Sequence, residues 1–282
     1  MRIANHIALL ASICLISFNN AFLIDFFISH PLLQAFQGFL QNVLKNENAI
    51  VVEQFPGQRT IQNLNIPENS ALLIIDVQND FISGTLPVPN GEQVVPFINK
   101  LLEIKETDFN AIVYTRDWHP EDHISFFGNR ELYGGLESMK MFEKVNLTRS
   151  NQLFYEQILW PRHCVQNELG SEFHPNLKII NSPTKTIQIK KGYKSQAEAY
   201  SGFFDNYHEF DTGLHAQLQA KNIANLFIVG LASDVCVDFT ARDGLDLGYK
   251  VSVIMDGSRG VYSEKVEKEV IPYWREIGVN VL

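Results

Sequence analysis

The sequence is poor in cysteine and in basic side chains. Its 282 residues include three cysteines, Cys14, Cys164 and Cys236, which are too few for a disulfide scaffold. The 23 Lys and Arg residues are outnumbered by 32 Asp and Glu residues, and the net charge is −9. Nucleic acids and anionic membranes bind clustered basic residues, so this charge argues against both as partners. The odd number of cysteines leaves at least one thiol without an intramolecular disulfide partner.

The N-terminal segment has the pattern of an export signal. Residues 7–18 form a short apolar run after Arg2, with the length of a signal-peptide core and too short alone to span a bilayer. We interpret residues 1–21 as a signal peptide; an uncleaved anchor and an amphipathic extension of a cytosolic protein are the alternatives. This interpretation predicts a secreted protein or one in the secretory lumen, with the cytoplasm as the alternative location. The single glycosylation sequon at Asn146 adds slight support.

Residues 22–69 are interpreted as a helical extension and linker. Apolar residues recur there at helical spacing and predict a short helix that packs on the main domain. They are Leu32, Leu33, Phe36, Phe39, Leu40 and Val43. Pro56, Gly57 and Pro67 then predict a loop before the main domain, which we place at 70–282.

The main domain alternates predicted strands and helices. Six runs, most of them continuous aliphatic stretches, predict buried strands at 71–76, 111–115, 186–190, 225–230, 250–255 and 279–282. Apolar residues at three- and four-residue spacing predict helices over 92–105, 213–222, 235–248 and 263–277. The alternation predicts an α/β fold with an open, mostly parallel six-stranded sheet and helices on both faces, in three layers. Segment 128–158 is expected to be irregular, as a lid or a surface insertion.

Reactive side chains follow the ends of four predicted strands. Ligands of such sheets bind at the carboxyl ends of the strands, so these residues are candidates for an active site. Cys236 lies where a strand gives way to a helix, and the free amides there should lower its pKa and could bind an oxyanion. The alternative is an inert buried cysteine. Asp76 follows an aliphatic strand, which suits a proton acceptor of raised pKa, although it could instead cap a turn. A lysine from the third strand could stabilise the thiolate, and spacing does not decide between Lys190 and Lys191.

One carboxylate and several imidazoles form a candidate metal site. Asp117 and His119 are two residues apart in a loop, His123 follows, and His163 lies further along the chain beside Cys164. This ligand set suits Zn²⁺, with Fe²⁺ or Mn²⁺ as alternatives. Surface histidines are the simpler interpretation, and Cys164 is expected to be a neighbouring thiol rather than a ligand.

Together, these segments resemble the nicotinamidase branch of the isochorismatase-like cysteine hydrolases over residues 70–282. The matching blocks are Asp76–Phe81, Thr115–Pro120 with His123, Trp160–Val165, Lys191-Gly192, Tyr200–Phe203 and Val229–Val237. All of these blocks occur in the order of that family, each at a predicted strand end or loop.

The resemblance implies a role for each site residue. Asp76, Lys191 and Cys236 correspond to the catalytic triad, and Asp117, His119 and His163 to the metal ligands. His123 corresponds to a histidine that lies near the metal and ligates it in some members only. The Leu231–Ala232 peptide corresponds to a non-proline cis bond, and the amides of Ala232 and Cys236 to the oxyanion hole. The residues expected around the substrate ring are Phe81, Trp160, Tyr200 and Leu231.

The resemblance also implies the reaction. It predicts deamidation of nicotinamide to nicotinate and ammonia through a thioester, with one divalent metal ion, with Zn²⁺ expected. Pyrazinamide is a further expected substrate, and we expect a homo-oligomer. One alternative is a related hydrolase that acts on an isochorismate-like vinyl ether or an N-carbamoyl amide. Another is a non-catalytic binding protein on the same fold.

Overall fold

The computed structural model describes residues 57–282. The predicted signal peptide at 1–21 and the predicted helix around 32–43 lie outside this described part. Within residues 57–282, no helix is both long and apolar enough to cross a membrane.

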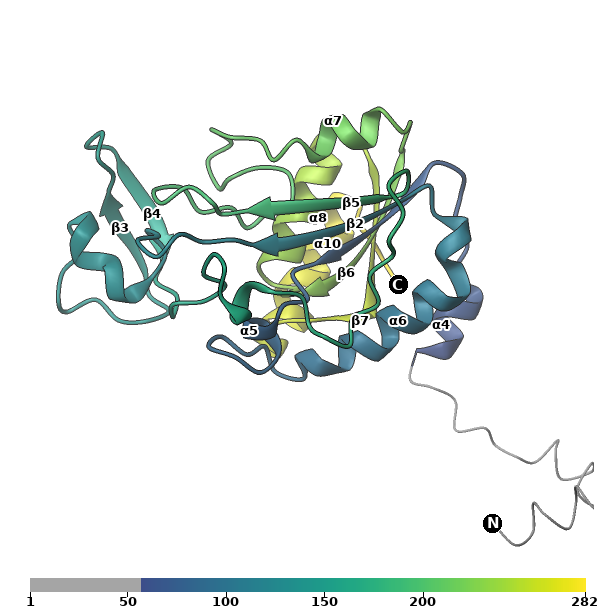
Figure 1. Cartoon of the computed structure of the whole chain (residues 1–282), viewed down its shortest axis with the longest axis horizontal. Coiled ribbons are helices and arrows are strands. Elements are labelled where there is room, and N and C mark those ends of the chain that lie inside the picture. The colour runs from purple at the N-terminus through teal and green to yellow at the C-terminus, as the bar shows by residue number, and fades with distance from the viewer. Residues whose placement is uncertain (1–56) are drawn as a thin grey trace, which may run out of the picture. The chain divides into compact units, whose positions relative to one another are not determined.

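The centre of the described chain is a six-stranded sheet in which every neighbouring pair is parallel (Figure 1). Its order is β5-β2-β1-β6-β7-β8. The strands are β1 (Ser70–Ile75), β2 (Ala111–Asp117), β5 (Thr186–Lys191), β6 (Asn225–Leu231), β7 (Lys250–Arg259) and β8 (Asn280–Val281). All six predicted strands are therefore confirmed, as is the α/β class of the fold. β1 is buried at every position because it lies between β2 and β6 with both faces covered.

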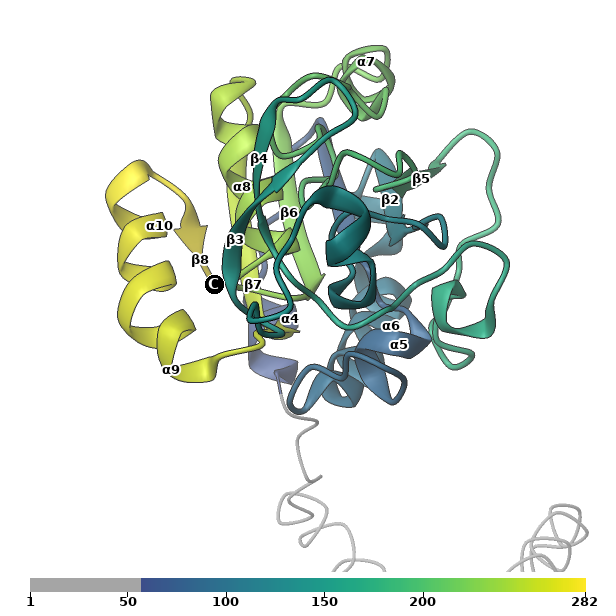
Figure 2. The ribbon, with the colours of Figure 1, turned by 90° about the vertical axis from the view of Figure 1, so that its left-hand side faces the viewer.

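Helices cover both faces of the sheet. Figure 2 shows α8 and α10 on one side of the strands and α6 on the other. The α-helices of six or more residues are α4 (Gln58–Asn63), α6 (Val94–Lys105), α7 (Leu214–Gln219), α8 (Cys236–Asp246) and α10 (Ile271–Ile277), with a π-helical turn at Val266–Val270 before α10. The remaining helical segments are α5 (Asn79–Ile82), α9 (Ser263–Lys265) and the 3₁₀ turns Gly91–Gln93, Glu106–Asp108, Phe127–Tyr133 and Leu169–Ser171. Helix α4 lies where the sequence predicted only a loop; it forms because buried Ile61 anchors a turn between Gly57 and Pro67.

The segment 128–158 is not irregular, which corrects the prediction. It contains an antiparallel hairpin of β3 (Lys144–Thr148) and β4 (Phe154–Ile158). Each strand alternates exposed and buried side chains, a pattern that a search for continuous aliphatic runs does not detect. The hairpin has a small core of its own, formed by Ile124, Tyr133, Val145, Leu147, Tyr155 and Leu159. Figure 1 shows it beyond the carboxyl ends of β2 and β5, which is where the site residues lie.

Candidate active site

The three residues of the predicted triad meet at the carboxyl edge of the sheet. Asp76 directly follows β1, Lys191 is the last residue of β5, and Cys236 is the first residue of α8. The Nζ atom of Lys191 lies 3.5 Å from the Sγ atom of Cys236 and 2.9 Å from Oδ2 of Asp76. All three side chains are buried. Lys190 is exposed and lies over the Trp118 ring, because successive strand residues face opposite ways.

Lys191 is held in place by further acceptors. Its ammonium group donates to Oδ1 of Asp117 at 2.5 Å and to the carbonyl oxygen of Ala199 at 2.9 Å. Burial lowers the pKa of Lys191, but the charges of Asp117, Asp76 and Cys236 outweigh burial and hold it well above its usual value. The lysine therefore provides a fixed positive charge beside the thiol.

The pKa of Cys236 does not fall as the sequence predicted. Burial raises the pKa of this thiol well above its usual value, and the carboxylates of Asp76 and Asp117 add to the rise, while Lys191 opposes it. The resting group is therefore a protonated thiol, and its reaction as a nucleophile requires a base.

Asp76 is suited to be that base. Its backbone has a φ of 48°, and Thr115 donates a hydrogen bond to Oδ1 at 2.7 Å. Oδ2 accepts no aligned hydrogen bond from the described residues, although it faces the ammonium group of Lys191. Burial raises the pKa of Asp76 to about 6, a rise that Lys191 and Thr115 limit and Asp117 increases. Asp76 is thus ionised at neutral pH and has an oxygen free to take a proton.

Asp117, His119 and His163 form a group that can hold a metal ion. Their ligand atoms lie within 4.8 Å of one another, and Nε2 of His119 and of His163 lie 3.5 Å and 3.8 Å from Oδ2 of Asp117. Nδ1 of His119 bonds to the carbonyl of Gly192 and Nδ1 of His163 to that of Pro161. These bonds leave both Nε2 atoms for a ligand role, and Nε2 of His119 is buried without a hydrogen-bond partner. These residues therefore fit a divalent ion.

The charges around this group also suit a cation. Burial lowers the pKa of His119, but the carboxylates of Glu198 and Asp117 outweigh it and raise the pKa to about 9. The same carboxylates would stabilise a metal ion, which displaces the proton of His119 when this histidine acts as a ligand. Burial and the neighbouring His119 lower the pKa of His163 to about 4, so its imidazole is neutral, as a metal ligand must be. Gly192 leaves space for the ring of His119, since a Cβ atom there would lie 2.4 Å from Cε1 of that histidine.

His123 lies behind the ligand group. Its ring stacks on His119 at 4.1 Å, while its Nδ1 bonds to Ser125 and its Nε2 to the carbonyl of Ala197. Sequence reasoning missed Glu198, a buried carboxylate within 4.8 Å of ligand atoms of His119 and His123. Glu198 follows no predicted strand and belongs to no spaced motif, so only its apolar neighbours Ala197 and Ala199 mark it in the sequence. Cys164 is buried but does not belong to the metal group, as expected.

The amides expected to bind an oxyanion are free. The peptide between Leu231 and Ala232 is cis, as the resemblance implied. Neither the Ala232 nor the Cys236 amide donates to an acceptor within the described part of the chain. The turn that carries them is anchored by Asp234, whose carboxylate accepts hydrogen bonds from the amides of Val261 and Tyr262. The thiol and two available N–H groups therefore belong to one short turn.

A narrow pocket opens on the thiol and the metal group. Its lining includes Phe81, Trp160 and Tyr200, as expected, with Asp117, His163, Glu198 and Cys236. Leu231 was expected beside the substrate ring, but it does not line the pocket. Its side chain is fully buried, and the neighbouring Ala232 lines the pocket instead. Leu231 is the last residue of β6, and its side chain packs toward Gly91 in the core.

A buried thiol at a helix start, with a lysine and a carboxylate beside it on a parallel sheet, defines the class of α/β cysteine hydrolases. The Isochorismatase domain model matches residues 70–281, and the chain belongs to this family. The nicotinamidase of Escherichia coli (strain K12) is 38% identical over 192 residues, which are 68% of this chain and 83% of that protein. The nicotinamidase of Saccharomyces cerevisiae is 35% identical over 207 residues, which are 71% and 94% of the two chains. The family resemblance and the expectation of an enzyme of the nicotinamidase group are confirmed.

Solved structures support the same assignment. The yeast nicotinamidase bound to the inhibitor nicotinaldehyde superposes with a TM-score of 0.66 at 30% identity, covering 76% of this chain and 99% of that one. The pyrazinamidase of Pyrococcus horikoshii in complex with zinc has a TM-score of 0.58 at 33% identity, covering 76% and 98%. These likenesses confirm the isochorismatase-like fold.

Proposed function

We propose that this protein hydrolyses nicotinamide to nicotinate and ammonia through a thioester on Cys236. The proposal rests on one pocket that is lined both by Cys236 and by two residues of the metal group, Asp117 and His163. The pocket can therefore present one end of a small aromatic amide to the thiol and the other end to the metal group. The aromatic lining from Phe81, Trp160 and Tyr200 suits a flat ring.

In the first half of the reaction, Asp76 takes the thiol proton of Cys236. The sulfur attacks the carboxamide carbon, and the resulting oxyanion accepts hydrogen bonds from the Ala232 and Cys236 amides. Lys191, at 3.5 Å from the sulfur, stabilises the thiolate as it forms. Asp76 then passes its proton to the departing nitrogen, so that ammonia leaves and the thioester remains.

In the second half, water hydrolyses the thioester. Asp76, ionised again, takes a proton from the attacking water, and the same two amides receive the second oxyanion. The C–S bond breaks and the proton on Asp76 returns to the sulfur. The acid that leaves loses the remaining water proton to solvent and is released as nicotinate. The pKa of about 6 for Asp76 allows it to accept and return a proton near neutral pH.

The metal group, with its ion bound, would position the pyridine ring of the substrate. A divalent ion held by Asp117, His119 and His163, with Zn²⁺ the expected metal, would act as a Lewis acid for the ring nitrogen of a pyridine amide. The pyrazinamidase of similar fold that was solved with zinc supports this choice of metal. Lys191 binds Asp117 as well as facing Cys236, so one side chain links the ring-binding group to the nucleophile.

The test is ammonia release by the metal-loaded protein from a panel of amides. Nicotinamide should be hydrolysed, with pyrazinamide as a second substrate. Ureidoacrylate is the comparison compound, because relatives named ureidoacrylate amidohydrolase match at 23–29% identity. Hydrolysis of ureidoacrylate without hydrolysis of nicotinamide would replace the proposed substrate. Binding of nicotinamide without any ammonia release would favour a non-catalytic protein.

Export and self-association are proposed from the sequence. We propose that residues 1–21 are removed during entry to the secretory pathway and that the mature protein is a homo-oligomer. N-terminal sequencing of protein from its native source tests the first proposal, and an intact Met1 or Arg2 contradicts it. Light scattering of the purified protein tests the second, and a monomeric mass contradicts it.

A further inference from the structure

The single glycosylation sequon of the sequence lies on the outer face of the hairpin. Asn146-Leu147-Thr148 is the sequon, and it forms the last three residues of β3. Leu147 is fully buried in the core of the hairpin, whereas Asn146 is exposed and Thr148 is half-buried. Alternate residues of a strand face the same way, so the side chains of Asn146 and Thr148 share the outer face.

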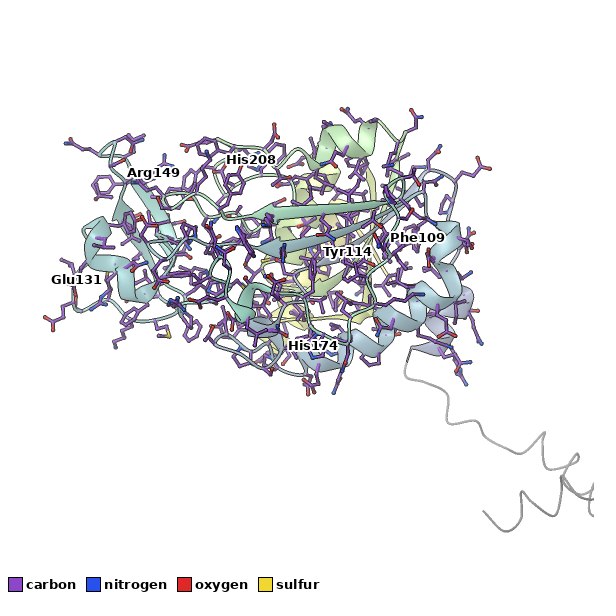
Figure 3. The ribbon with its side chains drawn as sticks, viewed as in Figure 1. Phe109, Tyr114, Glu131, Arg149, His174 and His208 are labelled. Atoms are coloured by element: carbon purple, nitrogen blue, oxygen red, sulfur yellow. The ribbon has the colours of Figure 1, made fainter. Side chains whose placement is uncertain are left out.

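The fold does not use the side chain of Asn146. Its amide makes no hydrogen bond to any residue in the described part of the chain. The end of the strand is instead anchored by the next residue, Arg149, which is buried and donates two hydrogen bonds of 2.7 Å to Glu209. Figure 3 shows Arg149 on the hairpin, apart from Tyr114 on the sheet. No residue of β3 or β4 lines the pocket, so a group attached to Asn146 would leave the pocket lining unchanged.

An exposed aromatic ring lies beside the sequon. Phe154 of β4 pairs with Thr148, and it is 77% exposed. Asn146 pairs with Glu156, so Phe154 is its diagonal neighbour on the same face. Such neighbours are about 7–8 Å apart, which is within reach of large side groups. A sugar on Asn146 is a group of this size, and the C–H bonds on one face of a sugar ring are attracted to the negative face of an aromatic ring.

We propose that Asn146 carries an N-linked glycan whose first sugar packs on the ring of Phe154. The proposal rests on the entry to the secretory pathway proposed above, because the donor for this transfer is a lipid-linked oligosaccharide of that pathway. Nδ2 of Asn146 attacks C1 of the first sugar. The N–C1 bond forms, the bond from C1 to the pyrophosphate oxygen of the lipid breaks, and one amide proton is lost. The glycan then extends from the outer face, away from the core of the hairpin.

The first test is the mass of the peptide that contains Asn146. The full chain is produced in eukaryotic cells and mapped by mass spectrometry before and after treatment with peptide N-glycosidase. We expect a glycan on Asn146 that the enzyme removes, with conversion of this residue to aspartate. Asn146→Gln and Thr148→Ala should abolish the glycan. Thr148→Ser is the matched control, since serine preserves the sequon and the glycan should remain.

The second test concerns Phe154. Tm is measured for the glycosylated protein and for Asn146→Gln, each with and without Phe154→Ser. Loss of the glycan should lower Tm by about 1–5 °C when Phe154 is present, and by less in the Phe154→Ser background. Leu169→Ser is the control, because Leu169 is 79% exposed and lies outside the hairpin. Equal shifts in the two Phe154 backgrounds would contradict the packing of the sugar on this ring.

The outcomes separate this proposal from the earlier ones. A mature protein that has lost residues 1–21 but has an unmodified Asn146 overturns the glycan and leaves export intact. An unmodified Asn146 in a protein with an intact Met1 contradicts both. A protein with the glycan that releases no ammonia from nicotinamide supports the glycan and overturns the proposed reaction. Because Asn146 lies outside the pocket, Asn146→Gln should keep the kcat/KM of the wild type for nicotinamide.

Discussion

The carboxyl edge of the sheet and the β3–β4 hairpin contribute to one pocket in different ways. The edge supplies charged and reactive groups, namely Asp76, Asp117, Lys191 and Cys236, each fixed by the end of a strand or the start of a helix. The hairpin supplies a small apolar core, the Tyr155 hydroxyl, which accepts a hydrogen bond from the Glu198 amide, and the Gln157 side chain, which donates one to Tyr200. The groups that react and the groups that hold the pocket residues in place therefore come from separate elements. Substitutions in the two regions should therefore have effects of different kind and size.

The largest effect is expected from the edge, at Cys236. Cys236→Ala removes the nucleophile and should lower kcat by at least about 10⁴-fold, as is typical when a covalent nucleophile is lost. Stability and metal content should change little. Cys164→Ala is the matched control, because Cys164 is the second buried free thiol among residues 57–282 and lies outside the metal group. Equal loss of ammonia release in both variants, measured at the same metal content, contradicts the assignment of the nucleophile.

The second effect concerns the metal. His119→Ala removes a buried ligand nitrogen and should weaken metal binding by more than the roughly 10–100-fold that loss of an outer partner costs. Activity should fall with metal content, as measured by elemental analysis and chelator competition. His215→Ala is the control, since His215 pairs with Tyr249 and belongs to none of the metal-capable groups among the described residues. An active, metal-free His119→Ala protein excludes the proposed metal site.

A smaller effect is expected from pH. Asp76 must be ionised to take the thiol proton, and its pKa is raised to about 6, chiefly by burial. Because the acid form is inactive, kcat/KM should be constant above about pH 7 and fall about tenfold per pH unit below 6. The pH profile of ammonia release measures this directly. A profile that stays flat down to pH 4.5 would remove Asp76 from the role of base.

The same contrast explains what could be predicted from the sequence. Apolar runs, most of them continuous, located the strands of the sheet, so residues next to their ends, such as Asp76 and Cys236, were found. Glu198 was missed because it is placed by contacts that are distant in the sequence, such as the hydrogen bond from its amide to Tyr155 of the hairpin, 43 residues away. The pKa of Cys236 was predicted in the wrong direction for a related reason. The helix start is visible in the sequence, whereas the burial and the two carboxylates that raise the pKa of Cys236 arise only from packing.

The smallest effect on activity is expected from a substitution in the hairpin, at Tyr155. The hydroxyl of Tyr155 accepts a hydrogen bond from the amide of Glu198 at 2.9 Å. Tyr155→Phe leaves that buried amide unpaired, which typically costs about 1–3 kcal/mol of stability. Since Glu198 lines the pocket, kcat/KM should fall by about two- to tenfold, the effect of one hydrogen bond.

Metal content should remain that of the wild type, because the ligands Asp117, His119 and His163 keep their own contacts. Tyr207→Phe is the matched control, since its hydroxyl accepts from the amide of Glu156 in the same hairpin and has no bond to Glu198. Metal loss in Tyr155→Phe, or the same fall in kcat/KM in both variants, would show that the hairpin is not a separate orienting element. If only Tyr155→Phe loses activity with its metal retained, the hairpin acts on the pocket through Glu198 while the edge of the sheet holds the ion.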